Sequence, residues 1–190
     1  MGYMSNGQFC LTPDTSLFLD RDGVINKRKI GGYILSYDEF EFIDGVKQAL
    51  GIFNKYFRHI FIVSNQQGIG KGLMSENDFS SLTDKMMSDI ISSGGRIDKV
   101  YHCPDLKTVS SPDRKPNVGM AFKAARDFPE IVFSDSVMIG DSMSDMLFGK
   151  RCGMFTVFID NGTETDIDNE LIDMKFDNLL AYAEYISKAE

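Results

Sequence analysis

The sequence predicts an α/β fold in which one doubly wound parallel sheet is covered by helices. Short apolar segments alternate along the chain with segments whose apolar residues recur at helical spacing. Several of the apolar segments end in polar side chains where a strand would leave the sheet. The 190 residues suit one domain. We therefore expect an irregular N-terminal lead-in over residues 1–15 and a single domain over residues 16–190.

The composition limits the partners that the chain can have. The 20 Lys and Arg residues against 28 Asp and Glu residues give a net charge of −8, which disfavours binding to nucleic acid. The sequence has no apolar run long enough to cross a membrane and no signal peptide. Its three widely spaced cysteines do not form a disulfide framework. We expect a cytoplasmic monomer that binds neither nucleic acid nor membrane.

The first expected strand carries an acidic ending. The apolar residues 17–19 are followed by two carboxylates, Asp20 and Asp22, and then by Gly23, where the backbone must turn. The next segment, residues 27–39, is expected to form a loop or a small flap beside this acidic edge, with an ordinary solvated loop as the alternative. Its three consecutive basic residues are Lys27, Arg28 and Lys29.

The second expected strand, residues 59–63, follows a helix over residues 45–57. The strand ends in the polar residues Ser64, Asn65, Gln66 and Gln67, and a flexible, close-approach loop with glycines at 68, 70 and 72 follows. Ser75 is placed to cap a further helix that ends at residues 94–95. The apolar stripe of that helix is Phe79, Leu82, Met86 and Ile90.

A third strand is expected over residues 99–102, followed by a loop over residues 103–116 that contains Arg114 and Lys115. Pro116 can begin the next helix. The apolar stripe expected for that helix is Val118, Ala121, Phe122 and Ala125.

The fourth expected strand, residues 136–140, again delivers carboxylates, Asp141 and Asp145. A short helix over residues 146–152 ends at Gly153, and a fifth strand follows over residues 154–159. The chain then closes with an amphipathic helix over residues 176–189.

Polar strand ends of this kind indicate a binding site, because open parallel sheets bind ligands at their carboxyl edge. Two carboxylates as close as Asp20 and Asp22 repel each other and call for a divalent cation or a shared proton. One of them could attack a substrate while the other moves protons. The hydroxyl of Ser64 and the neighbouring amides suit phosphate oxygens. A calcium loop is disfavoured because Gly23 and apolar residues follow Asp22 directly.

These motifs together resemble those of the haloacid dehalogenase (HAD) phosphatase superfamily. The matching motifs are DRDGV at residues 20–24, the strand-ending Ser64, Lys115 in RKP, and GDSMSD at residues 140–145. The strings LFLDRDGVIN, FEFIDGV, VSNQQGIGKG, YHCP, RKPNVGM and MIGDSMSDM resemble the branch of D-glycero-D-manno-heptose 1,7-bisphosphate phosphatases and histidinol-phosphatases, and the heptose enzymes more closely. The resemblance spans residues 16–159 and implies a nearly capless, Rossmann-like fold.

The resemblance implies specific roles for the acidic residues. Asp20 would be the nucleophile that forms an aspartyl-phosphate, and Asp22 would protonate the leaving group and then activate water. Mg²⁺ would be held by Asp20, the backbone carbonyl of Asp22, and Asp141. Asp145 would either orient Lys115 or support the metal shell.

The resemblance also implies how the substrate is held. Ser64 and Lys115 would grip the phosphoryl oxygens, and Arg114 would meet the other charged groups of the substrate. We expect selectivity to come from Arg114, the flap with Arg28, and the amides of Asn65, Gln66 and Gln67.

One segment departs from the family pattern. The family commonly has a zinc loop with Cys-x-His near the third strand and Cys-x-Cys before RKP, whereas this chain has Asp105 at the histidine position and Ser111-Pro112-Asp113 at the Cys-x-Cys. Cys103 and His102 cannot complete a four-ligand site. We therefore expect no structural zinc and a loop held by hydrogen bonds and packing.

The resulting hypothesis is a Mg²⁺-dependent phosphomonoesterase that removes the 7-phosphate of D-glycero-D-manno-heptose 1,7-bisphosphate, a small phosphorylated sugar. A histidinol-phosphate phosphatase is the nearest alternative. A nucleic-acid 3′-phosphatase fits the acidic charge less well. A non-catalytic phosphosugar-binding protein is the alternative outside the enzymes.

Overall fold

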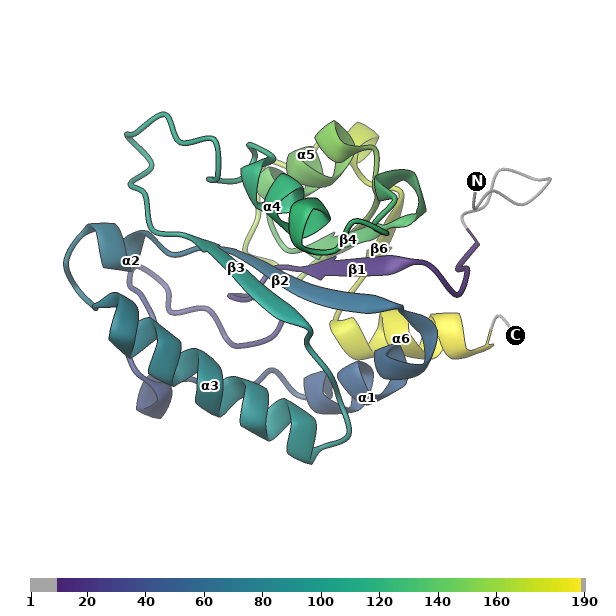
Figure 1. Cartoon of the computed structure of the whole chain (residues 1–190), viewed down its shortest axis with the longest axis horizontal. Helices are drawn as coiled ribbons and strands as arrows, with labels where there is room; N and C mark the ends of the chain where they lie inside the picture. Colours follow the sequence, from purple (N-terminus) through teal and green to yellow (C-terminus); the bar gives the residue numbers. More distant parts are fainter. Residues whose placement is uncertain (1–9, 189–190) are drawn as a thin grey trace.

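A computed structural model describes residues 10–188 and is built around a parallel sheet (Figure 1). Its strands run in the spatial order β3-β2-β1-β4-β5-β6, and every neighbouring pair is parallel. The strands are β1 (Ser16–Leu19), β2 (His59–Asn65), β3 (Lys99–Cys103), β4 (Val137–Gly140), β5 (Phe155–Ile159) and β6 (Met174–Phe176). This arrangement confirms the predicted doubly wound parallel sheet.

Helices cover both faces of the sheet (Figure 1). They are α1 (Val46–Tyr56), α2 (Gln67–Gly70), α3 (Glu76–Ser92), α4 (Gly119–Asp127), α5 (Met143–Cys152) and α6 (Leu179–Lys188), with 3₁₀ turns at Tyr37–Glu39, Phe133–Asp135 and Asn169–Leu171. Helices α1, α3 and α6 share one apolar core with the sheet, and α4 and α5 share the other. No helix within residues 10–188 is both long and apolar enough to cross a bilayer.

The two cores follow from the alternation of side chains along each strand. In β1, Leu17 and Leu19 point into the core beneath α1 and α6, whereas Phe18 points into the core beneath α4 and α5. Both faces of the strand are fully buried, which explains why the strand sequence is apolar without interruption.

The order of the strands places the polar strand ends together. After β1 the chain moves outward through β2 and β3, and it then crosses back to β4 on the other side of β1. The direction of winding therefore reverses between β1 and β4, which is where open α/β sheets form their ligand crevice. Asp20 follows β1 and Asp141 follows β4, so both lie at this point.

Two expectations for the glycine-rich and proline-containing segments need correction. The segment after Asn65 forms the short helix α2 instead of a flexible loop, although the expected close approach is present, because a Cβ on Gly70 would lie 2.4 Å from the carbonyl of Pro104. The helix expected from Pro116 begins at Gly119. Its buried face is Met120, Ala121 and Ala124, while Phe122 is 61% exposed. The helix offers two apolar stripes at helical spacing, and the stripe that contains Met120 is the one that packs into the core.

The remaining differences lie toward the C-terminus. Helix α5 begins at Met143, because Ser142 and Asp145 form a capping box three residues earlier than the apolar pattern suggested. The closing helix α6 begins at Leu179, because Phe176, where it was expected to begin, is the last residue of strand β6. That strand was not expected, since its three residues carry too little pattern to predict. Ala189, the last residue of the expected helix, lies outside the described residues.

The expected lead-in lies partly outside the described residues, which begin at Cys10. Residues 10–15 contain a turn but neither a helix nor a strand. The division of the chain into a lead-in and one domain stays a prediction.

Two helical glycines offer a matched test of how tightly α5 is held against the sheet. A Cβ on Gly149 would lie 2.6 Å from Cγ2 of Thr156 and 2.9 Å from Cβ of Met138, whereas a Cβ on Gly51 of α1 would meet nothing closer than 3.9 Å. Gly149→Ala should lower the free energy of unfolding by about 1–3 kcal/mol through overpacking. Gly51→Ala should raise it by about 0.5–1 kcal/mol. Urea denaturation followed by circular dichroism measures both, and equal effects would contradict the packing described for α5.

Candidate active site

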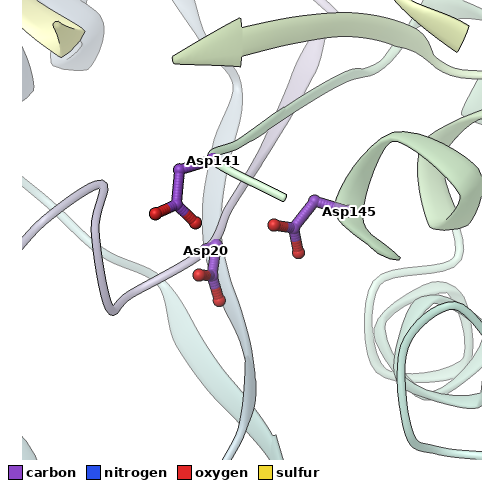
Figure 2. Close-up of side chains that lie close together, drawn as sticks. All are labelled: Asp20, Asp141 and Asp145. Atoms are coloured by element: carbon purple, nitrogen blue, oxygen red, sulfur yellow. The ribbon is translucent and has the colours of Figure 1, made fainter. Parts of the chain in front are cut away.

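Three buried carboxylates meet at the carboxyl edge of β1 and β4 (Figure 2). Asp20 continues from β1, and its backbone N–H donates to the carbonyl of Ile139 at 2.9 Å. Asp141 directly follows β4, and Asp145 lies in the first turn of α5. One oxygen from each carboxylate lies within 4.8 Å of the others.

Two glycines are required by the closeness of these carboxylates. Gly23 has a φ of +99°, and a Cβ there would lie 1.9 Å from Oδ2 of Asp141. A Cβ on Gly140 would lie 2.2 Å from Cβ of Asp145. Gly23 of the DRDG motif thus leaves room for a carboxylate of the GDSMSD motif, and Gly140 leaves room for the second carboxylate of its own motif.

Lys115 reaches into this acidic group from the loop before α4. Its Nζ lies 2.7 Å from Oδ1 of Asp20 and 2.6 Å from Oδ1 of Asp145, and it donates to the carbonyl of Val63 at 2.6 Å. Burial opposes the charge, but the carboxylates of Asp145 and Asp20 outweigh it and raise the pKa of Lys115. The side-chain amide of Asn65 exchanges two hydrogen bonds with the backbone of Lys115, at 3.0 and 3.1 Å. Lys115 is therefore a fixed cation.

Asp22 has a separate set of partners. Both of its carboxylate oxygens accept hydrogen bonds from Nη2 of Arg21 at 2.9 Å, and further bonds come from Asn26 at 2.9 Å and Gln66 at 2.8 Å. Burial opposes ionisation of Asp22, but the Arg21 charge and these hydrogen bonds outweigh it and lower the pKa. The amide of Gln66 also donates to Oγ of buried Ser64 at 2.8 Å. Ser64 is thus linked to Asp22 through Gln66.

Asp141 is fully buried and pairs with groups from two distant loops. Nη2 of Arg28 donates to Oδ1 at 2.8 Å, and Nδ2 of Asn161 donates to Oδ2 at 2.8 Å. Burial and the nearby charges of Asp20 and Asp145 raise the pKa of Asp141 to about 7, against the opposing charge of Arg28. Burial likewise raises the pKa of Asp20 to about 6, although Lys115 opposes it. The two carboxyls thus carry more negative charge than their neighbours neutralise.

These three carboxylates fit a magnesium ion. All of the donor atoms are oxygens, which hard divalent cations prefer. The raised pKa values of Asp20 and Asp141 reflect a shortage of positive charge that a divalent cation would supply. Within residues 10–188, no other three His, Cys, Asp or Glu side chains come close enough together to share a metal ion.

Of these three carboxylates, Asp20 and Asp145 line a cavity of about 840 Å³, and Asp141 is buried behind them. Its walls include the segment 28–34, Lys107 and Arg114. Asp20, Asp22 and Lys115 reach the cavity, as do the predicted substrate-binding amides Asn65, Gln66 and Gln67. The cavity is large enough for a small phosphorylated metabolite.

Sequence reasoning missed three residues that hold the carboxylates: Arg21, Asn26 and Asn161. Arg21 stands between the two aspartates of the first motif, and Asn26 closes the same stretch. Asn161 follows β5, so the rule that polar residues gather after parallel strands would have found it. Apart from that rule, a lone asparagine in a loop carries no signal.

The loop of residues 103–116 is held by hydrogen bonds. Asn117 donates to the carbonyl of Ser111 at 2.7 Å, and Arg114 donates to the carbonyl of Asp105 at 3.0 Å. Sγ of Cys103 lies 3.6 Å from Oγ of Ser111, and Nε2 of His102 lies 2.9 Å from Oε2 of Glu76. These contacts explain how the loop keeps its shape, while the expected absence of structural zinc stays a prediction.

Comparisons with known proteins agree with this geometry. Residues 113–181 match a family model described as HAD-hydrolase-like. The D-glycero-alpha-D-manno-heptose-1,7-bisphosphate 7-phosphatase of Campylobacter jejuni is 38% identical over 153 residues, which cover 80% of this chain and 86% of that protein. The D-glycero-beta-D-manno-heptose-1,7-bisphosphate 7-phosphatase of Vibrio cholerae is 37% identical over 148 residues, which cover 74% and 78%.

A solved structure has the same fold. The D,D-heptose 1,7-bisphosphate phosphatase of B. bronchiseptica, crystallised with magnesium and phosphate, superposes with a TM-score of 0.83 at 24% identity. The match covers 93% of this chain and 99% of that one. The parallel sheet with an acidic edge thus has the architecture of a HAD-like hydrolase. Within that class, the chain belongs to the D-glycero-D-manno-heptose 1,7-bisphosphate 7-phosphatase family, which confirms the resemblance drawn from its motifs.

The raised pKa values make the effect of magnesium on stability depend on pH. A carboxyl whose pKa is higher in the folded state than in the unfolded state destabilises the fold as the pH rises through that interval. The metal-free protein should therefore lose stability between about pH 4 and pH 7, as Asp20 and Asp141 ionise. Saturating Mg²⁺ should add little to the free energy of unfolding at about pH 5 and much more at about pH 8. Denaturant titrations with and without Mg²⁺ across this range measure the gain.

Two variants serve as controls for this experiment. In Asp141→Asn, the increase in the free energy of unfolding that Mg²⁺ causes should depend less on pH, because the side chain at this position no longer ionises. Asp113→Asn, which removes a carboxylate paired with Lys123 on the loop surface, should leave it unchanged. If Mg²⁺ raised the free energy of unfolding by the same amount at every pH, Asp20 and Asp141 would not lack positive charge in the metal-free protein.

Proposed function

We propose that this protein is a Mg²⁺-dependent phosphomonoesterase that acts on a small phosphorylated sugar through an aspartyl-phosphate. The observation that carries the proposal is the placement of Asp20 in the cavity, 2.7 Å from the fixed cation Lys115 and within the carboxylate group that fits magnesium. Metal-dependent release of phosphate from p-nitrophenyl phosphate tests it directly.

In the first step, a carboxylate oxygen of Asp20 attacks phosphorus and the ester oxygen of the substrate leaves. Attack by an anion on a phosphate dianion requires positive charge at the site. Lys115 supplies one such charge and is held in place by Asp145 and Val63. Magnesium, held by Asp20, the carbonyl of Asp22, and Asp141, would supply further positive charge to the phosphoryl oxygens. Covalent attachment to Asp20 divides one difficult displacement into two easier ones.

Asp22 is placed to move the protons of both steps. Its carboxyl reaches the cavity and is fixed by Arg21, Asn26 and Gln66. In the substrate-free protein the lowered pKa favours the carboxylate, which is the form that deprotonates water in the second step. For the first step Asp22 takes up a proton from solvent and donates it to the leaving alkoxide, and it regains a proton from the attacking water in the second step.

The cavity walls favour a substrate with a second anionic group. Arg28, Lys29, Lys107 and Arg114 all line the cavity. Such cations suit a second phosphate. The relatives named above act on heptose 1,7-bisphosphates, so we propose that the 7-phosphate of D-glycero-D-manno-heptose 1,7-bisphosphate is removed.

The alternatives fit these walls less well. Histidinol phosphate would bring a cationic amine to a cavity with basic walls, and an acidic chain offers little to nucleic acid. Asp20 and Lys115 are both in place, which favours an enzyme over a phosphosugar-binding protein without activity. The monomeric state and the cytoplasmic location stay predictions.

Asparagine variants test the two catalytic roles. Asp20→Asn should abolish turnover, because an amide of the same shape is a poor nucleophile. Asp22→Asn should slow turnover by roughly 10²–10⁴-fold, the usual contribution of general acid–base catalysis. Steady-state kinetics with p-nitrophenyl phosphate and Mg²⁺ measure both, and circular dichroism verifies the fold. Substantial hydrolysis by purified Asp20→Asn would refute the covalent mechanism.

A substrate panel tests the choice of sugar. The kcat/KM for heptose 1,7-bisphosphate should exceed that for histidinol phosphate by at least about tenfold, or ~1.4 kcal/mol of transition-state preference. Arg114→Ala should remove much of this margin, because Arg114 reaches the cavity. Arg126→Ala, which removes an equal charge from a 76% exposed side chain on α4, should preserve it. A preference for histidinol phosphate would overturn the assignment of the substrate but not the phosphatase activity.

A further inference from the structure

Three cationic side chains pair with the site carboxylates in the described part of the chain, and Arg28 differs from the other two. The side chains of Arg21 and Lys115 are 1% and 2% exposed, whereas that of Arg28 is 39% exposed. Lys115 is fixed by two carboxylates and a backbone carbonyl, while Arg28 forms its ion pair with Asp141. Arg28 is thus the cation that can leave the site with little loss of packing.

The backbone around Arg28 also permits movement. Immediately before it, the backbone N–H of Lys27 donates to the carbonyl of Glu41 at 2.9 Å, and the side chains of these two residues form an ion pair. Beyond it, Ile30 is 90% exposed, and a Cβ on Gly31 would find nothing within 4 Å. The segment 28–32 extends from this base. Its contacts, apart from that of Arg28, are the half-exposed ion pair of Lys29 with Glu39 and a turn hydrogen bond from Gly32 to Lys29. A half-exposed ion pair of this kind contributes little to holding the segment in place.

The partner of Arg28 is a carboxylate that fits the metal. Oδ1 of Asp141 accepts from Arg28 and Oδ2 accepts from Asn161, so both oxygens are engaged. A divalent cation on Asp141 would lie within a few ångströms of the Arg28 guanidinium, and two cations at that separation repel strongly in a buried site. Asn161 is neutral and carries no such conflict. Arg28 and a metal ion therefore compete for Asp141.

We propose that Arg28 is an exchangeable counter-ion, which neutralises Asp141 in the metal-free protein, releases it when a divalent cation is bound, and then binds the non-reacting phosphate of the substrate. The first part of this proposal rests on the contacts of Asp141 alone. The second part rests on the proposed phosphatase function. Together they make Arg28 a residue that couples metal loading to substrate selection.

The destination of Arg28 follows from the cavity. Arg28 already lines the cavity that Lys107 and Arg114 also line. A planar guanidinium donates two parallel hydrogen bonds to two phosphate oxygens, whereas an ammonium group acts as a point charge without this fixed pair of donors. Loss of the Asp141 contact would leave those donors free to face the cavity.

Calorimetric titration of Mg²⁺ into the substrate-free protein tests the exchange. Arg28→Gln keeps a neutral donor near Asp141 but removes the charge, and it should tighten the Kd for Mg²⁺ by about five- to tenfold, as expected for relief of a partly screened repulsion. Lys27→Gln is the matched control, since it removes the same charge from the neighbouring residue, which pairs with exposed Glu41. Its Kd should stay within about twofold of the wild-type value.

Other outcomes would overturn the exchange. An unchanged or weaker Kd in Arg28→Gln would mean that Arg28 does not compete with the metal but at most orders Asp141 for it. Equal tightening in Arg28→Gln and Lys27→Gln would reduce the effect to general charge. Because no turnover is measured, this result does not depend on the phosphatase function.

Kinetics at saturating Mg²⁺ test the second role. Arg28→Gln should raise the KM for heptose 1,7-bisphosphate by about tenfold or more while kcat falls much less, as expected when binding to a non-reacting group is lost. Arg28→Lys should restore only part of the affinity, because it lacks the paired donors. An unchanged KM in active Arg28→Gln would refute this role of Arg28. If the wild type hydrolyses no phosphomonoester, the proposed function and this second role fail together, and the metal exchange is judged by calorimetry.

Discussion

Mutual repulsion among buried carboxylates is the constraint on which the rest of this site depends. Asp20, Asp141 and Asp145 bring their oxygens within 4.8 Å of one another in the protein interior, with Asp22 two residues from the first. Such a group is unfavourable unless cations or protons compensate it. The raised pKa values of Asp20 and Asp141 show that the protein alone compensates it incompletely. A site with this shortage is suited to bind a divalent cation and, with it, an anionic substrate.

The compensating groups come from different parts of the chain, and each one fixes a loop. Lys115 ties the segment before α4 to β1 and α5, while Arg28 ties the segment after β1 to Asp141. Asn161 links the loop after β5 to the same carboxylate. The loops that shape the cavity are therefore positioned by the charges they neutralise. A change in the charge of the site, such as metal binding, acts directly on the contacts that hold these loops.

Much of the fold and of the site could be predicted because the signals are local. Leu17 to Leu19 are apolar on both faces, which marks a central parallel strand, and the polar residues after the strands then converge by topology. Asp20, Asp22, Asp141 and Lys115 were placed together in this way, and the structure brings them together. Phe122 was misplaced because Met120, Ala121 and Ala124 form a competing apolar stripe on the same helix, and only the packing of α4 on the sheet decides between the two. Strand β6 was missed because three residues form a strand only beside β5.

The sequence by itself determined the parallel sheet, the carboxylates at its edge and the family, because the hydrophobicity of a strand and a short motif depend only on residues that are close in sequence. Only the tertiary structure decided which cation meets which carboxylate. Arg28 and Asp141 are 113 positions apart, and Lys115 and Asp20 are 95 apart, so no spacing rule connects them. Asp22 is paired with Arg21 and has a lowered pKa, whereas burial raises the pKa of Asp20, two residues away, against the opposing charge of Lys115. Charge and burial depend on distances across the fold, and these exist only once the chain has folded.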